Sequence, residues 1–234
     1  IIHIFKYMKK NILSIILFLI LTTHSFSHEE HYKNVNSLKY ELFRNDKSIG
    51  YHVYEFERKK EYLEVKSIIE FKIRKLGVDL YKYDAVSQEE YKKNQLIKFS
   101  SNTTQNKKIK NTNIDFDKKK KELVITGSEN KLVSPKEYPV GTWWNHEIVQ
   151  AKAQISAISG RIIEQKVTFL GEVQLNLYGK SHTALHFNFS SSDKSLPDNK
   201  KLNTNVWYDK KTKLWLKAEF NNTGRWEYRL KDYN

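Results

Sequence analysis

Residues 63–74 read LEVKSIIEFKIR, and this stretch decides the fold class. Apolar side chains recur at every second position over most of it, and charged side chains occupy the positions between them. This period of two is typical of a half-buried β-strand, in which successive side chains point to opposite faces. The apolar face comprises Leu63, Val65, Ile69, Phe71 and Ile73, and the charged face comprises Glu64, Lys66, Glu70, Lys72 and Arg74.

Similar alternation continues on both sides of this stretch and predicts an antiparallel meander. Extended segments are expected over residues 38–42, 49–56, 78–86, 96–103, 109–116 and 122–126. The lysine run at residues 118–121 lies between two of them and predicts a solvated hairpin tip. In the last third, strands are expected at residues 173–177, 185–189, 207–208, 214–220 and 226–230, separated by turns.

One helix is predicted after the tryptophan pair, because apolar residues recur there at helical spacing. The apolar positions are Ile148, Ala151, Ile155 and Ile158, with Asn145 as the N-cap and Gly160 as the stop signal. About ten strands with one or two helices and short connections predict a mainly β fold. We expect a curled antiparallel sheet, an unclosed barrel or β-cup, as a single domain over residues 37–234.

The N-terminal residues have the layout of a signal peptide. Lys9 and Lys10 precede an apolar run over residues 12–21, which is about half the length that a transmembrane helix needs. We therefore favour a cleaved signal peptide over a membrane anchor, with cleavage after Ser27 and a flexible mature N-terminus over residues 28–36. Met8 is the only methionine and stands just before Lys9, so two alternatives stay open: translation begins at Met8, or residues 1–7 belong to the protein. These features predict a periplasmic protein, soluble after cleavage.

The composition is basic, with 41 Lys and Arg against 27 Asp and Glu. Lysine is abundant together with Asn and Ile, and the lysines are scattered among acidic residues instead of forming a stripe. We therefore expect no nucleic-acid partner, whereas peripheral contact with an anionic membrane is compatible with this charge. The chain has no cysteine, which excludes disulfides, a lipoprotein anchor and thiol chemistry. The oligomeric state is left open.

Cleavage after Ser27 would create a terminus that starts with His28 and continues to His31, and these are the candidate metal ligands. Their imidazoles and the new amine are ligand types that copper or nickel prefers. The alternative is a solvated terminus without a specific metal. His146 and Glu147 begin a zinc-protease motif, but Gln150 stands where its second histidine belongs. No cofactor is expected.

All five tryptophans lie in the C-terminal half of the chain. Such a concentration of large aromatic side chains indicates either a ligand cavity or a core sealed by bulky residues. The candidate lining residues for a cavity are Trp143, Trp144, Trp207 and Trp215.

Several of these motifs together resemble a family of small exported proteobacterial proteins that carry a domain of unknown function. The similar elements are residues 40–44 and 49–51, Tyr138 with Pro139, residues 143–145, Gly160, residues 207–209 and residues 226–230. A more distant similarity is to periplasmic lipoprotein carriers, whose unclosed barrel surrounds a helical plug and holds acyl chains. That resemblance implies a hydrophobic cup, by analogy of fold.

Three functional hypotheses follow. The leading one is a non-catalytic envelope protein that binds an apolar or amphipathic ligand, a lipid for example, in a β-cup. The second is an envelope scaffold or assembly factor, which predicts a filled core without a cavity. The third is a copper enzyme that uses His28, which predicts copper binding that is lost when His28 is replaced.

Overall fold

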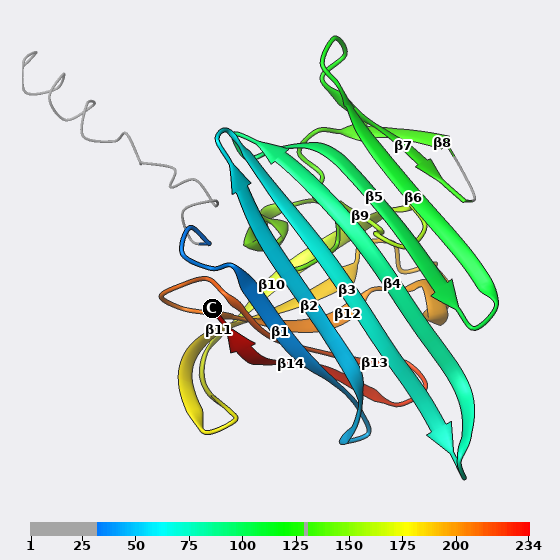
Figure 1. Cartoon of the computed structure of the whole chain (residues 1–234), viewed down its shortest axis with the longest axis vertical. Helices are drawn as coiled ribbons and strands as arrows, with labels where there is room; N and C mark the ends of the chain where they lie inside the picture. The colour runs from blue at the N-terminus through cyan, green and yellow to red at the C-terminus, as the bar shows by residue number, and fades with distance from the viewer. Residues whose placement is uncertain (1–31, 129–130) are drawn as a thin grey trace, which may run out of the picture.

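The computed structural model describes residues 32–128 and 131–234, which form fourteen β-strands and two short 3-10 helices (Figure 1). The first eight strands are β1 (Ser37–Arg44), β2 (Lys47–Lys59), β3 (Tyr62–Lys75), β4 (Val78–Lys92), β5 (Gln95–Gln105), β6 (Lys108–Asp117), β7 (Glu122–Gly127) and β8 (Lys131–Pro135). The remaining elements are η1 (His146–Gln150), β9 (Ala153–Ile155), β10 (Ile162–Leu177), β11 (Lys180–Ser191), η2 (Asp198–Lys200), β12 (Asn203–Asp209), β13 (Trp215–Asn221) and β14 (Arg225–Tyr233).

All fourteen strands belong to one sheet, and each strand pairs antiparallel with its neighbours. The order is β8-β7-β6-β5-β4-β3-β2-β1-β14-β13-β12-β11-β10-β9, so β1 and β14 pair in the middle. The two ends of this order, β8 and β9, do not pair with each other, and the sheet is not closed. The predicted unclosed antiparallel sheet is confirmed, but the expected count of about ten strands was too low. The strands β8 and β9 have five and three residues, too short for alternation to reveal them.

The predicted helix was wrong in kind and in length. Only the five residues of η1 are helical, and Asn145 caps them by accepting a hydrogen bond from the backbone N–H of Glu147 at 3.1 Å. Ile155, which the helical spacing included, lies in β9 and pairs with Ile162 at the sheet edge. Pairing with β10 supplies the backbone hydrogen bonds that a helix would otherwise have provided. Contacts with a distant strand therefore outweighed the helical spacing of the apolar residues in this segment. No helix in residues 32–128 or 131–234 has the length and apolarity needed to cross a bilayer.

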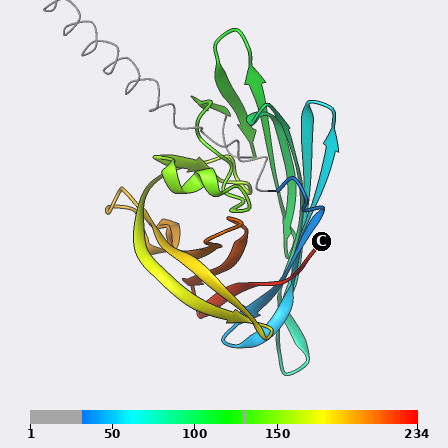
Figure 2. The ribbon, with the colours of Figure 1, turned by 90° about the vertical axis from the view of Figure 1, so that its left-hand side faces the viewer.

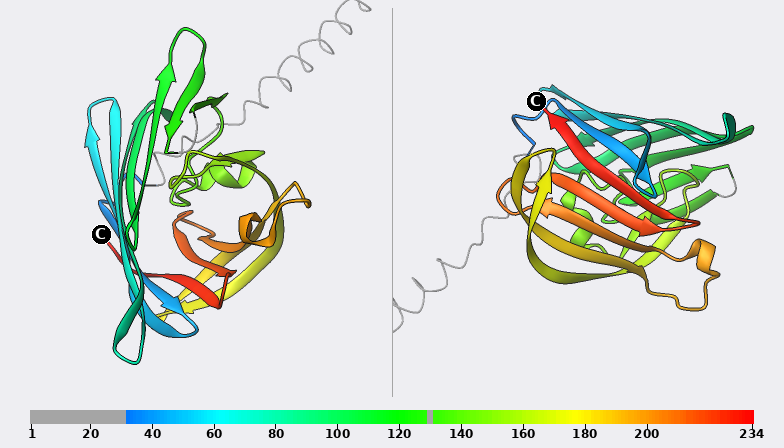
Figure 3. Two further views of the ribbon diagram at one scale, coloured as in Figure 1. Left: turned by 90° about the vertical axis from the view of Figure 1, so that its right-hand side faces the viewer. Right: turned by 90° about the horizontal axis from the view of Figure 1, so that it is seen from below.

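The sheet bends into two arms that face each other (Figures 2 and 3). One arm comprises the long strands β1 to β7, and the other comprises β10 to β14. The segment between β8 and β10, residues 136–161, lies between the arms, where the sequence analysis expected a helical plug. Alternate side chains of both arms point into the concave interior, which we call the cup, and form the main hydrophobic core.

Tyr32 belongs to this core, although the sequence analysis assigned it to a flexible N-terminal segment. Its ring stacks on Phe56 at 5.2 Å and meets the edge of Trp144 at 5.5 Å between ring centroids. Its hydroxyl accepts a hydrogen bond from the backbone N–H of Trp215 at 3.4 Å. Tyr32 is 1% exposed, so the packed domain begins before β1.

Strands β2 and β3 approach each other unusually closely at Gly50. A Cβ atom on Gly50 would lie 2.6 Å from Cα of Phe71 and still closer to the carbonyl oxygen of Glu70. Both obstacles belong to the backbone of β3, which cannot move without shifting the sheet. Glycine is therefore required at this position by space.

We expect Gly50→Ala to lower the free energy of unfolding by about 1–3 kcal/mol, as overpacking of a well-packed site does. Chemical denaturation followed by tryptophan fluorescence measures the change. The neighbouring Tyr51→Ala is the control, because this side chain is 42% exposed and its loss should change stability much less. An alanine variant at Gly50 as stable as the control would contradict this account of the close approach.

Candidate ligand-binding site in the cup

His52 of β2 lies at the centre of the cup among aromatic rings. Its ring centroid is 4.2 Å from that of Tyr54, 6.0 Å from that of Tyr40 and 6.1 Å from that of Trp215. Its Nε2 lies 2.7 Å from Oγ of Ser67 on β3. Burial lowers the pKa of His52 to about 3, so the imidazole is neutral near pH 7.

Tyrosine hydroxyls hold the segment between β8 and β9 against the interior. The hydroxyl of Tyr54 donates a hydrogen bond to the carbonyl of Thr142, and that of Tyr208 donates to the carbonyl of Trp143 at 2.9 Å. Trp143 itself has a φ of +58°, in the left-handed region that bulky residues rarely adopt. The two hydroxyls accordingly fix a backbone conformation that the local sequence disfavours.

Glu89 of β4 is completely buried at the side of the cup. The hydroxyl of Tyr91 donates a hydrogen bond to Oε2 at 2.6 Å, and Nε1 of Trp144 donates to Oε1 at 2.9 Å. Burial raises the pKa of Glu89 above its ordinary value, and the hydrogen bonds from Tyr91 and Trp144 partly oppose this rise. The carboxyl group thereby connects β4 to the segment that precedes η1.

A cavity of about 280 Å³ lies between the two arms and the 136–161 segment. Its aromatic lining residues are His52, Tyr54, Tyr83, Trp143, Trp215, Phe220 and Tyr228, and its polar ones include Ser67, Ser87, Ser101, Thr103, Thr142 and Gln154. No Lys, Arg, Asp or Glu is among the residues that line it. The cavity is close to the lower end of the size range of small-molecule sites, and it offers rings and neutral polar groups.

Three of the lining residues have a buried ring nitrogen without a hydrogen-bond partner among the described residues. These atoms are Nδ1 of His52, Nε1 of Trp143 and Nε1 of Trp215. A buried donor or acceptor without a partner costs about 1–3 kcal/mol, so such groups are rare in native cores. All three belong to residues that line the same cavity.

The structure separates the four predicted tryptophans. Trp143 and Trp215 line the cavity, and their ring centroids are 5.5 Å apart. Trp144 is buried beside Glu89 and is not a lining residue. Trp207 lies on the convex face of the sheet, where it stacks on His186 at 4.3 Å and lies 4.8 Å from Nζ of Lys217.

The predicted metal ligands His28 and His31 lie outside the described residues. Within the part of the chain that the structure describes, no group of three or more His, Asp or Glu side chains is arranged to hold a metal ion. His182 contacts Asp209 with Nδ1 at 3.3 Å, and His186 contacts Asn205 with Nε2 at 3.3 Å. The proposed copper site remains a prediction.

His52, Tyr54 and Glu89 were not expected from the sequence to lie in the interior. A signal existed for His52 and Tyr54, since residues 49–56 were predicted as a strand and these two share a face with Phe56. Glu89 gave no such signal, because a carboxylate within a polar run is normally exposed.

A family model matches most of the described domain. A model of a family described as "Domain of unknown function (DUF6134)" matches residues 40–231. The chain belongs to this family. The DUF6134 match includes β2 to β13, most of β1 and β14, and all residues that line the cavity. A search of curated proteins finds no match to the chain.

The DUF6134 domain is also similar in structure to a solved protein of another uncharacterised family. This is a "beta-barrel-like protein of domain of unknown function DUF1849" from Brucella abortus, with a TM-score of 0.62 and 11% sequence identity. The similarity covers 86% of this chain and 97% of that one. At this identity the likeness establishes the barrel-like fold alone.

We expect the melting temperature of Glu89→Gln to rise, relative to that of the natural protein, as the pH rises. Because the folded state raises the pKa of this carboxyl, the unfolded chain releases its proton first. The stability that the group contributes is present below its ordinary pKa and is lost as the pH rises through the folded-state pKa. Glutamine does not titrate, so the difference in melting temperature between variant and natural protein should grow from about pH 4 to about pH 8.

Glu90→Gln is the matched control, since Glu90 is the next residue of β4 and points to the opposite face. Its melting temperature relative to the natural protein should change little over the same range. A pH-independent effect of Glu89→Gln, or one that shrinks as the pH rises, would show that burial does not favour the protonated form of Glu89.

Proposed function

We propose that this protein is a non-catalytic binding protein that holds an apolar or amphipathic small molecule in the cup. The observation that carries the proposal is the aromatic cavity of about 280 Å³ with three unpartnered ring nitrogens around it. Burial of the ligand would supply the affinity, since each CH₂ group removed from water contributes about 0.8 kcal/mol. Such binding needs no catalytic motif.

The uncharged lining indicates which part of the ligand enters. A charged headgroup in this cavity would have no opposite charge among the lining residues, and burying an unpaired charge is costly. We therefore infer that an apolar chain or ring enters the cavity and that any charged group stays at its opening.

The proposal includes export to the periplasm, which rests on the signal-peptide pattern of residues 1–27. The competing scaffold hypothesis predicts a filled core, and the interior cavity favours ligand binding over it. The hypothesis of a copper enzyme at His28 has no support of this kind in the described residues.

We expect Ala85→Phe to weaken ligand binding, because Ala85 lines the cavity on β4 and a phenyl ring there would occupy part of it. A titration with N-phenyl-1-naphthylamine, an uncharged fluorescent probe, measures the affinity. If the new ring keeps a part of the ligand equal to two CH₂ groups out of the cavity, the binding free energy is weakened by about 1.6 kcal/mol. This corresponds to roughly tenfold weaker binding or more. Native mass spectrometry of the natural protein, with lipid extract added, identifies which molecules enter.

Val173→Phe is the control, because it adds a phenyl ring at a 37% exposed site on β10 that does not line the cavity. Both variants should keep a cooperative thermal transition. If the natural protein takes up neither probe nor lipid, or if both variants bind as the natural protein does, the interior is not a ligand site.

A further inference from the structure

A hairpin of residues 72–82, formed by the ends of β3 and β4, projects from the sheet. At its base, Lys82 still exchanges hydrogen bonds with Asn106 in the β5–β6 turn: its N–H donates to Oδ1 of Asn106, and its carbonyl accepts from the N–H of Asn106, both at 2.8 Å. The pairing of β2 with β3 reaches Phe71, and that of β4 with β5 ends at Tyr83. Beyond these residues only the cross-strand pairs between β3 and β4 continue, up to Lys75 with Val78. This projecting hairpin is the lowest part of the sheet in Figure 1 and extends past the β5–β6 turn.

The tip of the projecting hairpin is apolar and exposed. Leu76 is 94% exposed, Val78 is 61% exposed and Leu80 is 55% exposed. Leu76 also has a φ of +51° in the turn, a conformation that favours Gly or Asn over Leu. Other turns of the meander follow that preference with polar residues, such as Asn45 with Asp46 and Lys93 with Asn94. Neither hydration nor turn geometry accounts for leucine at this position.

Cations lie along the projecting hairpin and beside its base. Lys72, Arg74, Lys75 and Lys82 belong to the projecting hairpin, and Lys47 follows the adjacent β1–β2 turn. Arg74 forms an ion pair with Asp79 at 2.6 Å, and Lys82 forms one with Asp84 at 3.2 Å. By contrast, Lys47, Lys72 and Lys75 make no ion pair with any acidic residue that the structure describes.

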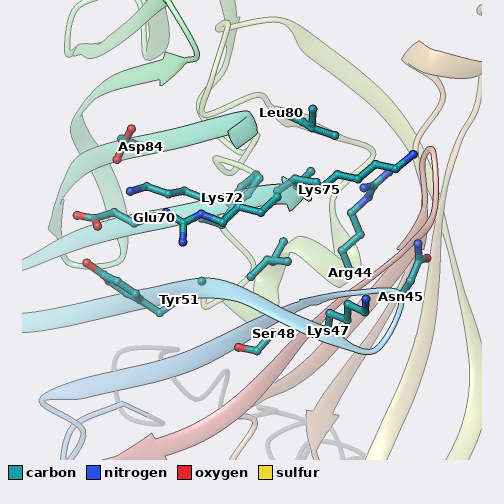
Figure 4. A pocket seen from close by; sticks show the side chains of 15 residues that line it. Arg44, Asn45, Lys47, Ser48, Tyr51, Glu70, Lys72, Lys75, Leu80 and Asp84 are labelled. Carbon is teal, nitrogen blue, oxygen red and sulfur yellow. The ribbon is translucent and has the colours of Figure 1, made fainter. Parts of the chain in front are cut away.

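Two further features indicate that Lys47, Lys72 and Lys75, which we call the free lysines, do not stabilise the fold. Lys72 lies directly opposite Lys82 in the β3–β4 pairing, and like charges opposite each other destabilise a sheet. Figure 4 shows Lys47, Lys72 and Lys75 with Arg44 around an open hollow of about 780 Å³ at the base of the hairpin. Glu70 and Asp84 also line this hollow, but cations outnumber them.

We propose that the projecting hairpin docks the protein on an anionic lipid surface. Leu76, Val78 and Leu80 insert into the boundary between headgroups and acyl chains, and the free lysines contact lipid phosphates. An apolar tip bordered by lysines is complementary to such a surface, which offers both a negative potential and an apolar layer beneath it. The docking surface is separate from the interior cavity and does not depend on ligand binding there.

Leu76→Asn tests the apolar part of the proposal without damaging the fold, because asparagine tolerates the left-handed conformation better than leucine does. Its melting temperature should stay equal or rise. Co-sedimentation with vesicles of equimolar phosphatidylglycerol and phosphatidylethanolamine should show binding weakened by roughly tenfold or more, as the loss of a buried leucine side chain implies. Vesicles of phosphatidylcholine alone should bind the natural protein weakly.

The charged part is tested with a triple variant, Lys47→Gln, Lys72→Gln and Lys75→Gln, which should weaken binding by about fivefold for each charge removed. The matched control replaces Lys118, Lys119 and Lys121 by Gln in the β6–β7 turn, at the opposite end of the meander. This control should bind almost as the natural protein does. Equal losses in the two triple variants, unchanged binding of Leu76→Asn, or no binding to anionic vesicles would each overturn the proposal.

Discussion

Buried tyrosine hydroxyls hold the two arms and the intervening segment together, and the shape of the cup depends on them. Tyr40 on β1 donates a hydrogen bond to the carbonyl of Trp215 at 2.7 Å, which connects the centre of the sheet to β13. Tyr54 and Tyr208 reach the 136–161 segment from opposite arms. Burial raises the pKa of each of these three tyrosines well above its ordinary value, so the hydroxyls keep the protons they donate. An unclosed sheet has two free edges, so strand pairing alone does not keep its two arms facing each other. The hydrogen bonds of the three tyrosine hydroxyls stabilise this bent shape.

The same burial determines the chemistry of the interior. Burial lowers the pKa of His52 to about 3, so its imidazole is neutral near pH 7, and burial raises the pKa of Glu89 above its ordinary value. A neutral interior can be lined by polar side chains and still accept an apolar molecule. The unpartnered nitrogens of His52, Trp143 and Trp215 lie in that neutral environment, where an added hydrogen-bond partner would be most favourable.

The cup and the projecting hairpin present different kinds of apolar side chain. The cup encloses aromatic side chains between its arms, whereas the projecting hairpin exposes aliphatic ones at one end of the sheet. A binding protein that exchanges an apolar molecule with a membrane needs both an enclosed site and a way to stay near the lipid surface. The two proposals are compatible but rest on separate observations.

The sequence by itself determined most of the strands, although not the short β8 and β9, because period-two alternation is a local property that is present in residues 63–74 and in most of their neighbours. It also indicated Trp143 and Trp215 as residues of interest, through the clustering of tryptophans. Only the tertiary structure decided that Trp207 faces outward, that residues 153–155 form a strand and that His52 and Glu89 are buried. Those outcomes depend on which strands meet when a fourteen-stranded sheet bends, and that is set by contacts between residues far apart in the chain.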